Sequence, residues 1–481
     1  YAFRGANSGN MLSFETDFSI EKVVKLEQNY RSLGNILDGA NALIKNNDGR
    51  LGKNLWTDQG EGEPIRVFRA MTDGEEASFI IEEIQALRNS GIELKNMALL
   101  YRSNAQSRIL EHGLFSSGIP YKVYGGLRFF ERQEVKHALA YLRLIASPDD
   151  DGALLRIINF PTRGIGNRTI ESIRDLAERS GTSLWQAACS APLSGRATTA
   201  VTGFINLIEK LKNETAGFSL PELIEHSIEG SGLAEHYQKD RDGQDRLENL
   251  NELINAASAF IADRDNAPSL EPQIEDGTEE GFNLTEIDPL IDFLAHASLE
   301  AGDNQAHAGE DALQLMTVHS AKGLEFHSVF ISGLEEGLFP HENSINEHGG
   351  LEEERRLMYV AMTRAMRRLY LSHSQMRMLH GQTRYNIESR FIDEIPDNLL
   401  KKINDAKSST TTAGPSVQKS TIISQKTQRG FRIGQQVQHA KFGVGTVVQV
   451  EGQGADSRLQ VNFSESGLKW LALEYAKLTR V

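Results

Sequence analysis

Residues 314–326 read Gln314-Leu-Met-Thr-Val-His-Ser-Ala-Lys-Gly-Leu-Glu-Phe326, and this stretch decides the fold class. In an extended segment Leu315 and Thr317 fall on one face and Gln314, Met316 and Val318 on the other, which predicts a β-strand. The polar residues between His319 and Glu325 then predict a turn, and the apolar run at Val329 predicts a second strand. A polar turn between two strands is typical of the functional loops at the carboxyl edge of an α/β sheet. We therefore expect this turn to bind a ligand, rather than to be an ordinary solvated connection.

Further α/β segments lie on both sides of this stretch. Short apolar runs predict strands at residues 65–68, 97–101, 121–124 and 367–372. Amphipathic patterns predict helices between them, among them residues 75–87 and 107–115. The run Met97-Ala-Leu-Leu-Tyr101 is continuously apolar, as expected of a parallel strand that is buried on both faces. Because helix and strand alternate, the sequence predicts a parallel α/β layer.

Residues from about 132 to 301 have a different pattern. Helix follows helix without a convincing strand, which predicts a large all-α domain inserted into the sheet domain. Inside it, Pro161-Thr-Arg-Gly-Ile-Gly-Asn-Arg168 is a glycine-rich turn before a predicted helix. Glycines permit close backbone approach to a phosphate, and a helix N-terminus supplies free N–H donors. The turn is either a plain interhelical connection or, given its two arginines, a contact to a DNA backbone, and both interpretations stay open.

The composition limits the class of protein. The chain has 481 residues, of which 39% are hydrophobic and 24% charged, so we expect about two to four ordinary globular domains. No apolar run approaches the length of about 18 residues that a membrane span needs. An apolar signal segment at Tyr1 is absent as well, which favours a cytoplasmic protein without membrane association. The single cysteine, Cys189, excludes an internal disulfide framework, and we expect it to be a buried and inert thiol.

The charge is unevenly distributed. The formal net charge is −15, which on its own argues against binding to nucleic acid. However, residues 263–288 are strongly acidic, whereas residues 355–390 are rich in arginine. Because local patches rather than the net charge decide binding, a DNA-binding face can coexist with acidic surfaces elsewhere.

The C-terminal segment changes character twice. Residues 407–427 are rich in Ser, Thr and Gln, which predicts a flexible linker. The last fifty residues or so alternate short apolar strands with glycine turns, for example around Phe442-Gly-Val-Gly445. This pattern predicts a small β-barrel of the Tudor or SH3 type, which is too small to be an enzyme on its own.

The sequence motifs exclude several classes of catalytic and binding site. The chain contains no Gly-x-x-x-x-Gly-Lys-Ser/Thr phosphate loop, no His or Cys cluster with zinc spacing and no Gly-x-Ser-x-Gly elbow. What remains are arginines at the ends of predicted helices, namely Arg31 after Tyr30 and Arg364 after Thr363. A guanidinium keeps its charge and presents a planar fork to phosphate oxygens, so such arginines suit a phosphoryl-transfer site. They are equally consistent with solvated helix ends.

Several longer stretches resemble the motifs of superfamily 1 helicases of the UvrD/PcrA/Rep group. These are Glu27-Gln-Asn-Tyr-Arg-Ser32, Met316-Thr-Val-His-Ser-Ala-Lys-Gly-Leu-Glu-Phe326 and Glu352-Glu-Glu-Arg-Arg-Leu-Met-Tyr-Val-Ala-Met-Thr-Arg-Ala365, which look like the last three helicase motifs. Tyr1-Ala-Phe-Arg-Gly-Ala6 is similar to the end of the third motif. Residues 124–134 and 439–445 also match, so the resemblance covers essentially the whole chain.

The resemblance implies a domain organisation. Residues 1–27 would be the remnant of a first RecA-like domain, and residues 28–124 and 310–400 the two parts of a second. Residues 125–309 would be the helical insertion, residues 401–430 a flexible linker and residues 431–481 a Tudor-like β-barrel.

The resemblance also implies roles for individual residues. Arg31 and Arg364 would contact the γ-phosphate of ATP and act in catalysis, Tyr30 would stack on adenine and Glu325 would bind the ribose. Single-stranded DNA would be contacted by Phe3, Arg4, Arg102, Asn104, Thr317 and His319. Phe3 stands where the family usually has Trp, and it keeps a π-face for stacking on a base. Thr162, Arg163, Gly164 and Gly166 would contact the duplex backbone.

The function implied is that of an ATP-dependent 3′–5′ DNA helicase in nucleotide excision and mismatch repair. The implied partners are single-stranded DNA, the single-strand/duplex junction, repair proteins and, through the barrel, RNA polymerase. The family's phosphate loop and magnesium ligands do not occur in this sequence, so we expect a fragment with half of an ATP site and no metal site of its own. Two alternatives are the helicase part of a RecB- or AddA-like nuclease complex and a non-catalytic fragment that binds DNA and RNA polymerase.

Overall fold

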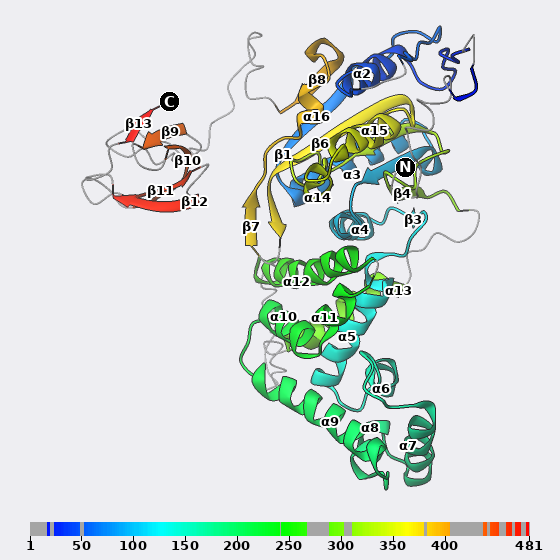
Figure 1. Ribbon diagram of the computed structural model, residues 1–481, viewed down its shortest axis with the longest axis vertical. Coiled ribbons are helices and arrows are strands. Elements are labelled where there is room, and N and C mark those ends of the chain that lie inside the picture. The colour runs from blue at the N-terminus through cyan, green and yellow to red at the C-terminus, as the bar shows by residue number, and fades with distance from the viewer. Residues whose placement is uncertain are drawn as a thin grey trace, which may run out of the picture. The chain divides into compact units, whose positions relative to one another are not determined.

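The computed structural model (Figure 1) describes residues 17–19, 24–48, 52–240, 242–266, 288–302, 310–379, 382–404, 436–439, 443–451, 458–463, 467–472 and 478–480. The chain divides into two compact units, Tyr1–Lys407 and Ser408–Val481. Residues 1–16, which include Phe3 and Arg4, and most of the predicted linker lie outside the described part.

An eight-stranded sheet forms the centre of the first unit. Its strands are β1 (Ile65–Thr72), β2 (Met97–Tyr101), β3 (Tyr121–Val123), β4 (Leu313–Thr317), β5 (Phe326–Ile331), β6 (Ala365–Leu379), β7 (Gln382–Tyr385) and β8 (Leu400–Ile403). The order is β3-β4-β2-β5-β6-β1-β8, with all neighbours along this path parallel, and β7 pairs antiparallel with β6. The predicted parallel α/β layer is therefore confirmed. Residues 401–403, which we expected to open the linker, belong to β8 instead.

Helices cover both faces of this sheet. One face carries α2 (Gly34–Ile44), α15 (Gly350–Met362) and α16 (Arg390–Asp393), and the other carries α3 (Asp73–Asn89) and α4 (Ser107–Ser116). The strands alternate between the two cores, because successive side chains of a strand point to opposite faces. Leu100 joins the core under α2 and α15, whereas Leu99 joins the core under α3 and α4. The short helix α14 (Glu342–Ile345) and the 3₁₀ turns η2 (Leu94–Asn96), η3 (Asn104–Gln106), η4 (Phe129–Glu131) and η5 (Asp397–Leu399) complete the connections.

Nine helices within the described residues form the insertion between β3 and β4. They are α5 (Gln133–Ala146), α6 (Asp151–Ile157), α7 (Asn167–Ser180), α8 (Leu184–Ser190), α9 (Arg196–Glu214), α10 (Leu220–Gly230), α11 (Leu233–Gln238), α12 (Gly243–Asn266) and α13 (Pro289–Gly302). They share a hydrophobic core of their own, which contains no residue of the sheet. The insertion therefore folds around its own apolar centre, and α12 and α13 carry polar contacts to the sheet domain, such as Arg108–Glu252 and His112–Glu300.

The second unit is a five-stranded antiparallel sheet. Its strands are β9 (Gln436–His439), β10 (Gly443–Glu451), β11 (Arg458–Phe463), β12 (Gly467–Ala472) and β13 (Leu478–Arg480), in the order β12-β11-β10-β9-β13. The predicted small β-domain is confirmed, whereas its closure into a barrel stays a prediction.

One local expectation is wrong. Cys189 was expected to be buried, but it is exposed near the end of α8, because the apolar stripe of that helix is formed by Leu184, Ala187 and Ala188. Just before α2, the hydroxyl of Ser32 donates to the carbonyl of Ala365, 2.6 Å away, and so ties the start of this helix to β6. Among the described helices, none is both long and apolar enough to span a bilayer.

Candidate nucleotide-binding and DNA-binding sites

Three segments that are far apart in the sequence meet at the amino edge of the sheet. Glu325 directly precedes β5, Arg364 directly precedes β6, and Arg31 precedes α2. Backbone hydrogen bonds join them: the amide of Phe326 donates to the carbonyl of Arg364 over 3.0 Å, and the amide of Leu33 to that of Met366 over 3.2 Å. The structure thus brings together the three charged residues for which the resemblance implies ATP contacts.

Arg31 and Glu325 form an ion pair at this edge. Nε of Arg31 lies 2.5 Å from Oε2 of Glu325, and Nη1 of Arg31 donates weakly to the carbonyl of Thr363 over 3.4 Å. The side chain of Glu325 is 51% exposed, so solvent screens the pair and its contribution to stability is about 0–1 kcal/mol. Because so little holds the pair together, either side chain can turn to a ligand at small cost.

Arg364 is held by backbone carbonyls. Its Nε donates to the carbonyl of Val360 over 3.1 Å, and its Nη1 to that of Leu324 over 2.9 Å. These bonds aim the guanidinium without neutralising its formal charge, since a carbonyl carries only a partial charge. Arg31 and Arg364 thus bring two guanidiniums to this edge, and the carboxylate of Glu325 pairs with that of Arg31, an arrangement that suits a phosphate group.

The turn that carries Tyr30 and Arg31 is fixed by Asn29, a residue that the sequence analysis missed. Oδ1 of Asn29 accepts from the amides of both Arg31 and Ser32, each over 2.8 Å. The signal was present, because Asn commonly binds backbone amides two residues ahead in such turns. The ring of Tyr30 is 71% exposed, which leaves its face accessible for stacking.

Thr317 and His319 lie at the other edge of the sheet. Thr317 ends β4 and pairs with Tyr101 at the carboxyl end of β2, whereas β5 begins opposite Met97 at the amino end of β2. Residues 318–325 therefore cross the sheet from one edge to the other, a distance of about 13 Å for the five residues of β2. We expected the polar residues from His319 to Glu325 to form one turn at the carboxyl edge, and this is wrong for Glu325. Because β4 and β5 both run parallel to β2, the chain has to return to the amino edge before β5 begins.

Arg102 directly follows β2 at the same carboxyl edge and forms a bidentate pair with Glu354 of α15. Its Nη2 lies 2.7 Å from Oε1 and its Nε 2.9 Å from Oε2 of that carboxylate, which is only 2% exposed. The sequence analysis missed Glu354, because a glutamate in a helix is usually solvated and its partner is 252 residues away. A DNA contact by Arg102 remains a prediction, and it would have to compete with this pair. Asn104 begins η3 two residues further on.

His319 is half-buried close to the Arg102–Glu354 pair. Burial, together with the positive charge of Arg102, lowers the pKa of His319 to about 4. The ring is therefore neutral at physiological pH and contributes hydrogen-bonding capacity, but no charge, to this edge.

The loop at residues 162–166 precedes α7 in the insertion. Thr162, Gly164 and Gly166 are exposed, and Gly164 has a φ of +80°, a conformation that favours glycine. Arg163, in contrast, turns inward: its Nη2 donates to the hydroxyl of Tyr141 over 2.5 Å and to the carbonyl of Ser231 over 3.1 Å. The amides of Arg163 and Ile165 also donate inward, to Oδ1 of Asn159, so the exposed part of the loop that an anion could approach is its glycines.

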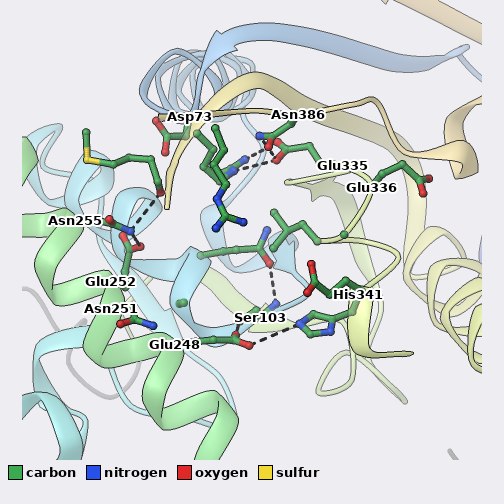
Figure 2. A pocket seen from close by; sticks show the side chains of 18 of the residues that line it. Asp73, Ser103, Glu248, Asn251, Glu252, Asn255, Glu335, Glu336, His341 and Asn386 are labelled. Carbon is green, nitrogen blue, oxygen red and sulfur yellow. Dashed lines mark hydrogen bonds and ion pairs between the residues drawn. The ribbon is translucent and has the colours of Figure 1, made fainter. Parts of the chain in front are cut away.

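A cavity of about 370 Å³ lies between α12 and the β6–β7 hairpin (Figure 2). Its lining contains six carboxylates, those of Asp73, Glu248, Glu252, Glu335, Glu336 and Glu342, against the two guanidiniums of Arg377 and Arg384. None of the residues implied in ATP binding lines this cavity. The acidic lining disfavours a phosphate, so this cavity is a poor candidate for a nucleotide site.

Comparison with known proteins gives a consistent result. The family model described as UvrD-like helicase C-terminal domain matches residues 24–376, and that of the PcrA/UvrD tudor domain matches residues 433–480. DNA helicase II of Escherichia coli is 46% identical over 487 residues, and the ATP-dependent DNA helicase PcrA of Bacillus subtilis is 40% identical over 499 residues. The ATP-dependent DNA helicase UvrD1 of Mycobacterium tuberculosis is 39% identical over 509 residues.

All of this chain is covered in these alignments, but it spans only 65% of the Escherichia coli and Bacillus subtilis proteins and 64% of the mycobacterial one. The first family model alone matches well over half of the chain. The chain therefore belongs to the family of UvrD-like helicases.

Proposed function

We propose that these 481 residues are the C-terminal part of an ATP-dependent DNA helicase of the UvrD type, which moves 3′ to 5′ along single-stranded DNA and acts in nucleotide excision and mismatch repair in the cytoplasm. The names of the relatives, DNA helicase II and ATP-dependent DNA helicase PcrA, support DNA and ATP as ligands. The observation that carries the proposal is the convergence of Arg31, Glu325 and Arg364 at one edge of a parallel sheet.

The amino edge supplies one face of the ATP site. Arg31 and Arg364 approach the γ-phosphate from this face and stabilise the charge that develops during phosphoryl transfer. Tyr30 provides a ring for adenine, and Glu325 leaves Arg31 to accept from the ribose hydroxyls. The phosphate loop, which does not occur in this sequence, supplies the opposite face.

Magnesium does not fit this edge. The two arginines repel a cation, and among the described residues that form the edge the carboxylate of Glu325 is already paired with Arg31. Mg²⁺ prefers oxygen ligands and the phosphates of its substrate. We therefore place its protein ligands on the phosphate-loop face.

ATP hydrolysis can drive movement because the guanidiniums of the amino edge contact the γ-phosphate in one state of the site and not in the other. The two faces of the site close because only the closed state lets both guanidiniums reach the γ-phosphate, and hydrolysis removes this contact. Residues 318–325 link the nucleotide edge to Thr317 and His319 at the DNA edge. If nucleotide binding shifts Glu325, this one short backbone segment can transmit the shift to Thr317 and His319, about one strand length away.

A second proposal concerns the C-terminal unit. Its match to the PcrA/UvrD tudor domain supports binding to a protein partner, and the resemblance implies RNA polymerase. The measurement is a pull-down of RNA polymerase core enzyme by the 481-residue chain and by residues 1–407. Equal recovery by both would contradict the assignment.

The helicase proposal is tested by unwinding. The protein that carries these residues together with a phosphate-loop lobe is incubated with ATP and with duplexes that bear either a 3′ or a 5′ single-stranded tail. We expect unwinding of the 3′-tailed duplex only. Unwinding of the 5′-tailed substrate alone, or nucleotide turnover that DNA does not stimulate, would overturn the assignment.

A further inference from the structure

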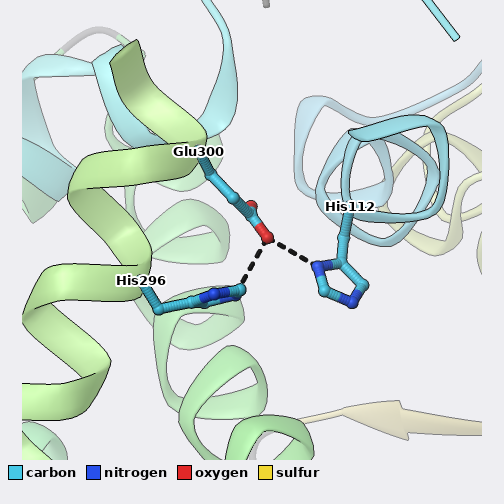
Figure 3. A group of neighbouring side chains, drawn as sticks. All are labelled: His112, His296 and Glu300. Carbon is cyan, nitrogen blue, oxygen red and sulfur yellow. Dashed lines mark hydrogen bonds and ion pairs between the residues drawn. The ribbon is translucent and has the colours of Figure 1, made fainter. Parts of the chain in front are cut away.

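Three side chains from two parts of the fold meet where the helical insertion adjoins the sheet domain. His112 lies on α4, and His296 and Glu300 lie one turn apart on α13 (Figure 3). Nδ1 of His112 is 2.5 Å and Nε2 of His296 is 3.0 Å from the same atom, Oε1 of Glu300. One donor atom from each residue lies within 4.8 Å of the other two. Figure 3 shows the carboxylate between the two rings.

We propose that His112, His296 and Glu300 bind a divalent transition-metal ion of the zinc type, which links α4 of the sheet domain to α13 of the insertion. Two imidazoles and one carboxylate are a common donor set for zinc, and either ring nitrogen can coordinate. The sequence shows no zinc-spacing motif, because 184 residues separate His112 from His296 and the group forms only in three dimensions.

The geometry needs little adjustment to accept an ion. Tetrahedral coordination with bonds of about 2.0–2.1 Å places neighbouring ligand atoms about 3.3 Å apart. The present nitrogen–oxygen distances are 2.5 and 3.0 Å, so the donors would have to separate by less than about 1 Å. A cavity of about 240 Å³ adjoins the three residues and leaves room for water in the fourth position.

The electrostatic environment also favours a cation. The side chain of Glu300 is 7% exposed, and its carboxylate lies between the two rings (Figure 3). The rest of the cavity lining carries two arginines, Arg108 and Arg264, and two aspartates, Asp263 and Asp292. These two positive and two negative charges cancel. The cavity lining therefore has a net negative charge, that of Glu300, when both histidines are neutral.

The ligand set predicts selectivity. Imidazole nitrogens suit zinc and its neighbours in the first transition row, whereas Mg²⁺ and Ca²⁺ prefer an all-oxygen shell. Magnesium supplied with ATP should therefore not compete for this site. Because the ligands come from both sides of the junction, a bound ion stabilises the arrangement in which α4 and α13 face each other.

The test is zinc binding by the untagged 481-residue protein, freed of metal beforehand and titrated with ZnCl₂ against a chromophoric chelator. We expect one equivalent to bind in the presence of millimolar MgCl₂, together with an upward shift of the apparent Tm. His112→Ala and His296→Ala should each weaken binding at least tenfold and abolish the Tm shift. Circular dichroism without zinc shows whether the variants are folded.

Two variants serve as controls. His226→Ala removes a histidine that pairs with Glu214 over 3.0 Å, without a third ligand among the residues that the structure describes, and it should leave binding unchanged. Cys189→Ser removes the only thiol of the chain and should also be neutral. If neither His112→Ala nor His296→Ala weakens binding, if Cys189→Ser abolishes it, or if no zinc binds, the proposal is wrong.

Discussion

The two edges of one sheet hold their arginines in different ways. At the amino edge, Arg31 pairs with a half-exposed carboxylate and Arg364 bonds to carbonyls. At the carboxyl edge, Arg102 is clamped by the buried Glu354, and Arg377 lies between two buried carboxylates. Charge that is fully neutralised and buried fixes a fold, whereas charge that is partly exposed and weakly paired can move to a ligand. The difference predicts that the arginines of the amino edge turn to a ligand more readily than those of the carboxyl edge.

The largest effect is expected for Arg364→Ala, which tests the role of the amino edge in a protein that includes the phosphate-loop lobe. We expect the turnover of ATP to fall by about 10³–10⁵, because an arginine that stabilises the transferred phosphoryl group is lost. Binding of single-stranded DNA should change little. Arg356→Ala is the matched control, since this arginine of α15 is partly exposed and pairs with its helix neighbours Glu352 and Glu353. Parallel loss of turnover and DNA binding would instead mean that Arg364 is structural.

Arg377→Met tests the opposite edge. The guanidinium lies 2.6 Å from Oε2 of Glu76 and 2.8 Å from Oε1 of Glu335, and its removal leaves two buried carboxylates without their partner. We expect the free energy of unfolding to fall by about 3–5 kcal/mol. Urea denaturation measures this change. Arg390→Met, which removes a half-exposed pair with Glu336, should cost at most about 1 kcal/mol, and equal losses would erase the contrast.

His319 allows the carboxyl edge to be tested through the pH dependence of stability. Its pKa is about 4 in the folded protein, below the usual 6.5, because burial disfavours the charged ring. Between these values the unfolded chain binds the proton and the folded chain does not, so stability falls as the pH drops from 6.5 to 4. The loss amounts to about 1–3 kcal/mol, allowing for partial solvent access. In His319→Gln this pH dependence should shrink by that amount, and an unchanged profile would contradict a buried neutral ring.

The smallest predicted effect concerns Arg102 and DNA. If this guanidinium leaves Glu354 for a phosphate, Arg102→Gln should make the salt dependence of single-stranded DNA binding shallower by about 0.7 in log–log slope. Fluorescence anisotropy at several salt concentrations measures this slope. A reduced stability with an unchanged slope would show that the Glu354 pair is permanent and that Arg102 does not bind DNA.

The sequence allowed most of the sheet to be predicted, because continuous apolar runs such as Met97–Tyr101 have few alternatives when helices separate them. It also identified Arg31 and Arg364, although only the resemblance gave them roles. The clamp by Glu354 could not be predicted, since a glutamate next to arginines in a helix is usually solvated. Nor could the inward turn of Arg163, which depends on the packing of Tyr141 and Ser231 from distant helices. Long-range pairing of polar groups therefore marks the limit of inference from this sequence.

The central claim is that the amino edge is one face of an ATP site whose other face carries a phosphate loop. Its most direct test is DNA-stimulated ATP turnover by the purified 481-residue chain, compared with the same residues joined to a phosphate-loop lobe. We predict no turnover above background for the chain alone and turnover that depends on both Arg31 and Arg364 for the joined protein. Comparable turnover by the 481 residues alone, or turnover in the joined protein that survives the loss of both arginines, would contradict the claim.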